Sequence, residues 1–264
     1  MGELERVLRA RRDRGGRSFV PYVTGGFPGV DASLLRALEE AGADALEVGI
    51  PFSDPVIDGG VVQEASRLSL EAGTRPADVL ATIHEANLSI PVAVMTYVNP
   101  VFRRGMEAFM HEAREAGVVG VIVPDVPVDE AGDLESAAAA AGIDAVLLAP
   151  PGTAPERLAA IAAAAHGFIY CVATYGVTGV RDALSDTGAA VVAALRPLTS
   201  LPLLLGVGIG TPAQAVEACG FADGAIVGSA LMSRMVAHDR DGAIALAASF
   251  ASAIRSLEPL RGEG

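Results

Sequence analysis

Short apolar runs alternate with amphipathic segments along the whole chain of 264 residues, and this alternation constrains the fold more than any other feature. The apolar runs are rich in Val, Ile and Leu without a polar alternation, which is typical of strands buried on both faces of a sheet. We expect eight strands, at Phe19–Thr24, Ala45–Val48, Pro91–Tyr97, Val118–Val123, Ala145–Leu148, Phe168–Ala173, Pro202–Val207 and Gly224–Val227. Helical patterns separate them, among them Ala32–Ala41, Pro76–Ala86, Met106–Ala116, Glu130–Ala141 and Pro155–Ala165.

Eight strands, each followed by a helix, are the number of units that closes a TIM barrel, and 264 residues suit one such domain. A repeated junction of helix end, glycine and strand start supports this reading, at Ala41–Leu46, Ala116–Val121, Ala141–Val146 and Cys219–Gly224. We expect the glycine there to adopt the left-handed conformation that ends many helices. The sequence thus predicts an α/β fold, a single (β/α)8 barrel over residues 1–264 with an extra N-terminal helix and connection in 1–17. A doubly wound sheet is the alternative.

Charge and residue usage exclude several classes of function. The formal net charge of −13 repels nucleic acid and anionic lipid. All 19 basic residues are arginines, which excludes Schiff-base aldolases, pyridoxal-phosphate enzymes and P-loop proteins, because each needs a lysine amine. Cys171 and Cys219 have apolar neighbours, which favours a reducing compartment over a cysteine-rich zinc site. No apolar run is long enough to span a membrane and no signal peptide is recognisable, so we expect a cytoplasmic protein.

One acidic residue, Glu47, lies inside an apolar strand, between Leu46 and Val48. In barrels of this kind the reacting groups lie at the C-terminal ends of the strands and in the loops that follow. Burial raises the pKa of a carboxyl group toward neutrality, where it is useful as an acid or base. The alternative is a glutamate paired with an arginine, but no arginine lies near it in the sequence. We therefore interpret Glu47 as catalytic.

The loop after this strand holds two more carboxylates, Asp54 and Asp58, among prolines that stiffen it and glycines that let it hinge. Such a pair could bind a metal ion. The four histidines, however, all lie in or at the ends of helical segments, away from the strand ends. We therefore expect no metal site.

Tyrosines and glycine-rich turns mark the remaining strand ends. Tyr97, Asp125 and Tyr170 each lie at one, and a hydroxyl on an apolar ring suits a planar aromatic substrate. Glycine-rich turns follow the last three strands, at Gly176–Gly179, Gly206–Gly210 and Gly228–Ser229. In barrels, backbone amides of the last two such loops and the N-terminus of a short helix bind phosphate. We predict a phosphate site there.

The stretch Leu46–Gly59 is similar, position by position, to the signature of the tryptophan synthase alpha chain family. The resemblance extends in the same order and spacing through Phe19–Thr24, Met95–Tyr97, Pro124–Pro127, Gly176–Gly179 and Gly228–Ser229. It implies cleavage of indole-3-glycerol phosphate to indole and glyceraldehyde 3-phosphate. This retro-aldol reaction uses no cofactor and needs no lysine.

The resemblance also implies roles for individual residues. Glu47 matches the catalytic glutamate, which could both protonate indole C3 and take the proton of the adjacent hydroxyl. Asp58 matches the carboxylate that accepts the indole N–H, and Tyr170 the tyrosine near the reacting carbons. Thr178 matches the loop threonine that meets this aspartate on closure. The implied phosphate cradle and the implied indole slot consist of Gly179, Gly208, Gly228 and Ser229, and of Phe19, Tyr22, Met95, Tyr97 and Ile122 respectively.

Three positions depart from the family pattern. Gly60 stands where the family usually has proline, so we expect a more mobile Asp58 loop. Gly210 replaces a frequent serine beside the phosphate turn, and Tyr22 replaces a common phenylalanine in the indole slot. These departures bear on the rate of the reaction and on how well ordered the Asp58 loop is, and not on the type of reaction.

By the same resemblance, the partner is a pyridoxal-phosphate beta chain that receives indole in an α2β2 heterotetramer. The Pro51–Asp58 loop, Asn99-Pro100 and Asp125–Pro127 would face it. A free-standing indole-3-glycerol-phosphate lyase shares the catalytic motif and is the alternative. Two further readings stay open: a sugar-phosphate isomerase on the same barrel, and a non-catalytic activator of a beta chain.

Overall fold

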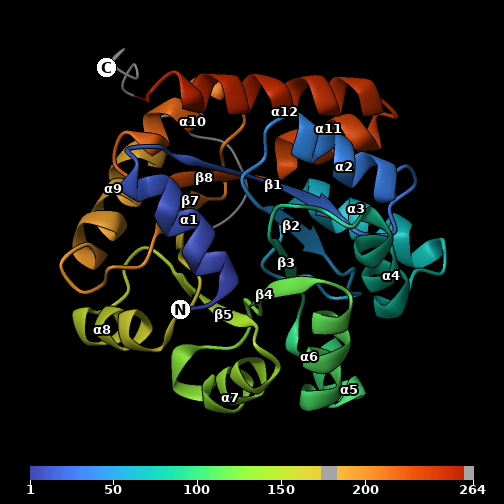
Figure 1. Cartoon of the computed structure of the whole chain (residues 1–264), viewed down its shortest axis with the longest axis horizontal. Helices are drawn as coiled ribbons and strands as arrows, with labels where there is room; N and C mark the ends of the chain where they lie inside the picture. The colour runs from blue at the N-terminus through green and yellow to red at the C-terminus, as the bar shows by residue number, and fades with distance from the viewer. Residues whose placement is uncertain (174–182, 259–264) are drawn as a thin grey trace.

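A computed structural model describes residues 1–173 and 183–258 of the chain, and its centre is a closed barrel of eight parallel strands (Figure 1). Each strand pairs with the next in the sequence, and the last pairs with the first. The strands are β1 Ser18–Thr24, β2 Leu46–Gly49, β3 Val92–Met95, β4 Val118–Ile122, β5 Asp144–Ala149, β6 Ile169–Val172, β7 Leu203–Gly206 and β8 Gly224–Val227. The predicted (β/α)8 barrel is therefore confirmed.

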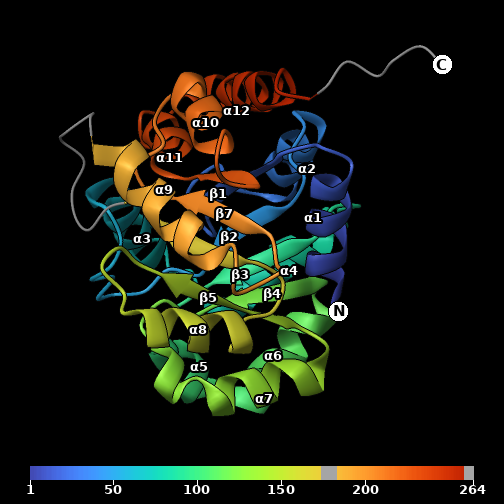
Figure 2. The ribbon, with the colours of Figure 1, turned by 90° about the vertical axis from the view of Figure 1, so that its left-hand side faces the viewer.

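Helices surround the barrel, as two perpendicular views show (Figures 1 and 2). More than one α-helix follows β2, β3 and β8, and a 3-10 helix precedes the α-helix after β4, where the sequence pattern predicted one helix per strand. In chain order they are α1 Glu3–Asp13, α2 Ala32–Glu40, α3 Gly60–Glu71, α4 Pro76–Ala86, α5 Val98–Arg104, α6 Met106–Glu115, the 3-10 helix η1 Val128–Glu130, α7 Gly132–Ala141, α8 Pro155–Ala164, α9 Ala183–Leu195, α10 Pro212–Cys219, α11 Ser229–Val236 and α12 Arg240–Arg255.

Apolar side chains cover both faces of the strands, which explains why the sequence shows no alternation in them. One buried cluster fills the barrel interior, and a second, larger one lies between the strands and the helices. The predicted N-terminal helix is confirmed as α1, whose Leu4 and Leu8 belong to the interior cluster. A Cβ on Gly120 would lie 2.6 Å from Leu4 Cδ2, so the glycine makes room for this helix to close the bottom of the barrel.

Two local predictions were wrong. β3 ends at Met95, and Tyr97, which was expected in the strand, is instead the residue that precedes α5. Gly220 has a φ of −66°, because its N–H continues the helical pattern by bonding to the carbonyls of Val216 and Glu217. At the other three junctions the glycine has the expected positive φ: Gly42, Gly117 and Gly142.

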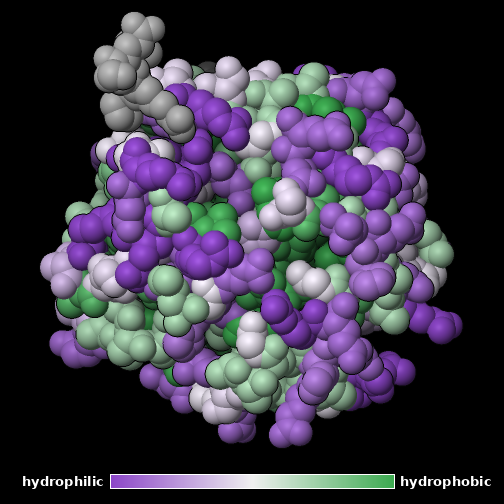
Figure 3. Space-filling model, in the orientation of Figure 1, coloured by the Kyte–Doolittle hydropathy of each residue, from purple (hydrophilic) through white to green (hydrophobic). Residues whose placement is uncertain are grey.

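The surface that carries α1 is mostly hydrophilic, with apolar patches between the charged side chains (Figure 3). Within residues 1–173 and 183–258, no helix combines the length and apolar character needed to cross a bilayer.

Candidate active site

Glu47 lies on β2 with only 1% of its surface exposed. Its Oε2 atom is buried and has no hydrogen-bond partner in the described part of the chain. None of the ion pairs formed by these residues includes Glu47, so the arginine-paired alternative finds no support. Burial and, second, repulsion from Asp58 raise the pKa of Glu47 to about 8. A buried carboxyl group without partners is costly, and such groups concentrate at functional sites.

Asp58 lies in the loop between β2 and α3, close enough to Glu47 for the two carboxyl groups to repel each other. Burial raises the pKa of Asp58 to about 6, and a hydrogen bond from the Tyr97 hydroxyl acts in the opposite direction. At neutral pH the site therefore combines a protonated Glu47 with an ionised Asp58. Two carboxyl groups with separated pKa values can act as an acid and as an anionic acceptor in the same site.

Tyr97 connects the end of β3 to the Asp58 loop. Its hydroxyl accepts the N–H of Ile57 at 3.2 Å and donates to the Asp58 carboxylate. Its ring stacks on Phe52, near the start of the loop, with a centroid distance of 5.0 Å and an interplanar angle of 25°. One side chain thus contacts the loop near both of its ends.

Two more tyrosines complete the group around the carboxylates. Tyr22 on β1 is the neighbour of Glu47 in strand register, and its hydroxyl lies 3.3 Å from Thr24 Oγ1. Tyr170 on β6 is also buried. Burial is the largest cause that raises the pKa of both hydroxyls, and the charges of Glu47 and Asp58 add to it.

Two glycines that sequence reasoning missed make space for these rings. A Cβ on Gly49 would lie 2.2 Å from the Tyr22 hydroxyl oxygen, and a Cβ on Gly206 would lie 2.4 Å from that of Tyr170. Both glycines are the last residues of their strands. A glycine ending a buried strand is a signal of close approach by a neighbouring side chain, but it does not say which side chain approaches.

The other predicted indole-slot residues do not all come together. Ile122 is buried in the interior cluster and Met95 packs against it. Phe19 instead belongs to the outer cluster, where its ring lies 6.0 Å from that of Phe250 on α12. Successive residues of a strand point to opposite faces, so Phe19 and Tyr22 lie on different faces of β1.

The predicted phosphate residues lie after the last two strands. Gly208 follows β7 with a φ of +91°, Gly228 precedes α11, and Ser229 is the first residue of that helix. A Cβ on Gly59 would lie 3.9 Å from Ser229 Oγ, so the Asp58 loop approaches this helix start. Thr178 and Gly179 lie outside the described residues.

Val207 lies in the predicted Gly206–Gly210 turn, and its backbone has a feature that the sequence pattern did not indicate. Its φ of 69° is in the left-handed region, which is rare for a β-branched residue and costs roughly 1–3 kcal/mol. Its side chain is 43% exposed, so burial of the side chain does not account for the strained backbone. Backbone strain of this kind is common in loops that hold ligands.

The four histidines, His84, His111, His166 and His238, are all exposed. Within the part of the chain that the structure describes, no three His, Cys, Asp or Glu residues are grouped as a metal site requires. The chemistry that the geometry offers is acid–base catalysis by the buried Glu47 and the partly buried Asp58.

The chain is similar to known proteins of one family over most of its length. The family model of the tryptophan synthase alpha chain matches residues 8–258. The chain is 42% identical to the tryptophan synthase alpha chain of Carboxydothermus hydrogenoformans, over 88% of each chain. It is 46% identical to that of Prochlorococcus marinus, over 83% of this chain and 82% of the relative.

Solved structures are also similar. A structure of Mycobacterium tuberculosis tryptophan synthase has a TM-score of 0.89 at 35% identity, covering 96% of this chain and 98% of that one. A tryptophan synthase alpha subunit from Legionella pneumophila has a TM-score of 0.88 at 31% identity, covering 97% and 99%. By sequence and by structure, the chain belongs to the tryptophan synthase alpha chain family, whose members cleave indole-3-glycerol phosphate to indole and glyceraldehyde 3-phosphate.

Proposed function

We propose that Glu47 and Asp58 carry out the cleavage of indole-3-glycerol phosphate in this chain. The observation that supports this most strongly is the buried Glu47 carboxyl group, whose Oε2 has no hydrogen-bond partner among the described residues and which is protonated at neutral pH beside an ionised Asp58. Neither a structural ion pair nor a metal ligand set accounts for it among the described residues.

The protonated Glu47 donates its proton to indole C3, which places positive charge on the ring nitrogen. Asp58 accepts the N–H of that nitrogen and stabilises the charge. The Glu47 carboxylate then takes the proton of the hydroxyl on the adjacent carbon, the C–C bond breaks, and the electron pair returns to the indole ring. Indole and the aldehyde are released, and Glu47 is protonated again.

The remaining groups hold the substrate. Tyr170 lies close to both carboxylates and is placed to orient the glycerol chain. The proposed indole slot consists of Met95 and Ile122 at the interior cluster, Tyr22 beside Glu47 in strand register, and Tyr97, which contacts the Asp58 loop. The phosphate binds to amides near Gly208 and Gly228 and to Ser229, at the positive end of α11. By family resemblance, Gly179 belongs to the phosphate cradle and Thr178 is the threonine that meets Asp58.

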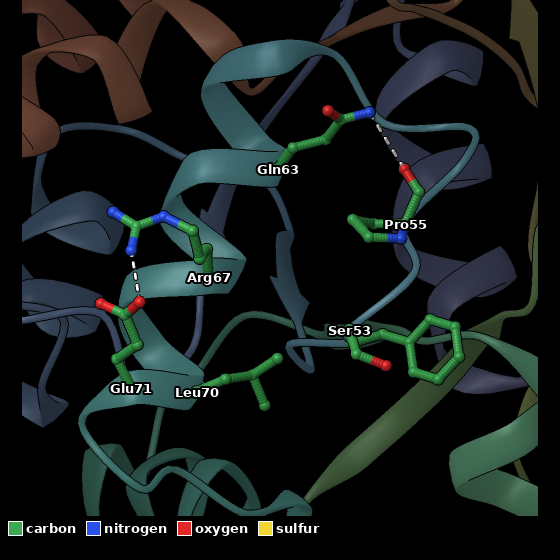
Figure 4. A pocket seen from close by; sticks show the side chains of 7 residues that line it. Ser53, Pro55, Gln63, Arg67, Leu70 and Glu71 are labelled. Carbon is green, nitrogen blue, oxygen red and sulfur yellow. Dashed lines mark hydrogen bonds and ion pairs between the residues drawn. The ribbon is translucent and has the colours of Figure 1, made fainter.

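Members of the family pair with a beta chain, and we propose the same α2β2 assembly here. Three large apolar side chains near the site are exposed: Val56 by 79%, Ile57 by 50% and Phe102 by 60%. Beside them, Phe52, Ser53 and Pro55 line a hollow of about 470 Å³ whose other side is α3, with Gln63 and Arg67 at its rim (Figure 4). Exposed apolar groups of this kind mark interaction surfaces.

The buried thiols of Cys171 and Cys219 are compatible with the cytoplasmic location that we also propose.

The test is indole release from indole-3-glycerol phosphate by the purified chain, alone and with a beta chain. We expect Glu47→Gln to lower kcat by roughly 10²- to 10⁴-fold and Asp58→Asn by roughly 10²- to 10³-fold. Glu115→Gln, an exposed carboxyl on α6, is the matched control and should retain full activity.

The outcomes separate the alternatives. Slow indole release that becomes much faster when the beta chain is added supports the proposal. Fast indole release that does not change when the beta chain is added indicates a free-standing lyase. Activation of a beta chain without any release by the wild type indicates a non-catalytic activator. Ribosyl-phosphate isomerisation without indole release indicates the isomerase alternative. Full activity of Glu47→Gln would remove Glu47 from the mechanism.

A further inference from the structure

The first turn of α5 is held by a side chain from another loop. Both carboxylate oxygens of Asp125, in the loop after β4, accept the N–H of Val98, at 3.0 and 3.2 Å. Val98 is the first residue of α5, and Tyr97, directly before it, forms no side-chain cap. The first N–H groups of a helix need an acceptor, which the residue before the helix usually provides. Here the acceptor is Asp125, which belongs to a different loop of the chain.

The Tyr97 side chain cannot cap α5 because it is engaged with the Asp58 loop. Its ring stacks on Phe52, and its hydroxyl bonds to the Ile57 N–H and the Asp58 carboxylate. The peptide unit that joins Tyr97 to Val98 is therefore held by Asp125 on one side, while the Tyr97 side chain holds the catalytic loop on the other. The hydrogen bonds between Val98 and Asp125 and those of the Tyr97 hydroxyl are joined through the covalent structure of Tyr97 and Val98, which links the loop after β4 to Asp58.

We propose that Asp125 is a positioning residue for Asp58, acting through Tyr97. This inference rests on the proposed function of Asp58. Without the Asp125 carboxylate the Val98 N–H loses its acceptor, the start of α5 loosens, and the Tyr97 hydroxyl no longer has a fixed position. Asp58 then loses the donor that holds it in place for the indole N–H.

The surroundings make this hydrogen bond important for the charge of Asp58. The titratable groups that face Asp58 are Glu47 from β2, Tyr22 from β1 and Tyr170 from β6, besides Tyr97 itself. Burial raises the pKa of Asp58, and the hydrogen bond from the Tyr97 hydroxyl lowers it. Loss of this bond therefore raises the pKa of Asp58 above its value of about 6.

The experiment compares Asp125→Ala, Asp125→Asn, Tyr97→Phe and the double variant Asp125→Ala/Tyr97→Phe in the chain without a beta chain. Asp125 lies in a loop that we expect to face that partner, so working without it isolates the effect inside the chain. The measurements are kcat and KM for indole release as functions of pH, and the Asp58 carboxyl pKa by carbon NMR titration.

We expect Asp125→Ala to lower kcat by roughly 10- to 100-fold, to change KM little, and to shift the acid limb of the kcat profile to higher pH. Asp125→Asn keeps an oxygen acceptor for Val98 and should recover most of this activity. The double variant should be no slower than Tyr97→Phe alone, because both changes break the same chain of contacts.

A purely structural role would lower Tm in Asp125→Ala without moving the acid limb or the pKa of Asp58, and this result would overturn the proposal. Additive losses in the double variant would also contradict it. The NMR titration needs no substrate. It therefore tests the positioning even if the wild-type chain releases no indole, an outcome that would count against the proposed function alone.

Discussion

Glu47 and Asp58 occupy one site, yet the pKa of Glu47 is raised to about 8 and that of Asp58 to about 6. Glu47 lies inside the barrel with an unpartnered oxygen, whereas Asp58 has the Tyr97 hydroxyl as a donor. Burial raises both pKa values; repulsion from Asp58 raises that of Glu47 further, and the Tyr97 hydrogen bond lowers that of Asp58, so the two carboxyl groups carry different charges at neutral pH. The same burial that raises the pKa of Glu47 means that the folded state loses stability when Glu47 ionises.

This cost predicts a specific pH dependence of stability. Unfolding lets Glu47 return to a pKa near 4.5, so between about pH 4.5 and 8 the unfolded chain loses a proton that the folded chain keeps. The wild type should therefore lose stability as pH rises through this range, and Glu47→Gln should lack that loss. We expect the variant to be more stable than the wild type by roughly 2–4 kcal/mol at pH 9 and similar at pH 4. Urea unfolding at a series of pH values measures the difference, and a difference that is constant with pH would contradict this account.

The loop from β2 to α3 carries Asp58, the second carboxylate of the proposed site. The Phe52 ring stacks on Tyr97, and the Asp58 carboxylate accepts a hydrogen bond from the Tyr97 hydroxyl. The loop ends at Gly59, whose backbone is extended, with a φ of −72° and a ψ of 157°. Gly60 then begins α3, at the position where proline fits a helix best because the missing N–H has no partner there in any case. A Cβ on Gly60 would meet nothing within 4 Å.

We expect Gly60→Pro to increase the free energy of unfolding by about 0.4–1 kcal/mol, because proline restricts the unfolded chain and fits the folded one. The extended backbone of Gly59 is the conformation that a residue before proline prefers. Chemical denaturation measures the change. The matched contrast is Gly73→Pro beyond the other end of α3, where the φ of +85° does not suit proline and destabilisation is expected. Equal effects at both positions would refute the argument.

At the scale of the whole barrel, α1 lies at one end and the proposed site lies at the other. α1 closes the bottom with Leu4 and Leu8, while the carboxylates and the glycine turns lie at the C-terminal ends of the strands. Strand ends at the bottom of such barrels serve stability, and those at the top serve catalysis. The bottom can therefore be weakened without a direct effect on the site.

Leu4→Ala should lower the free energy of unfolding by about 2–5 kcal/mol, because Leu4 is fully buried against Gly120 and Gly167. Below the melting transition, kcat and KM should remain those of the wild type. The matched control is Leu198→Ala, the same change at a side chain that is 45% exposed, for which we expect little effect. A fall in kcat for Leu4→Ala in fully folded protein would show that the two ends are not separate.

Local patterns in the sequence were enough to predict much of this protein. The eight strands, the N-terminal helix and the burial of Glu47 all follow from which residues are apolar over short stretches, because burial on both strand faces requires continuous apolar runs. The family resemblance added the reaction and most of the residues that we propose for the site. Strand ends were less accurate, since Tyr97 follows β3 instead of ending it.

Only the tertiary structure decided which side chains meet. Phe19 faces Phe250, Tyr97 bonds to the Asp58 loop, and Asp125 caps a helix 27 residues away in sequence. The sequence determined which segments become strands and helices, because that choice depends on residues within a few positions of one another. The direction of each ring and the pKa of each carboxyl group depend on neighbours from distant segments, which become neighbours only when the barrel closes.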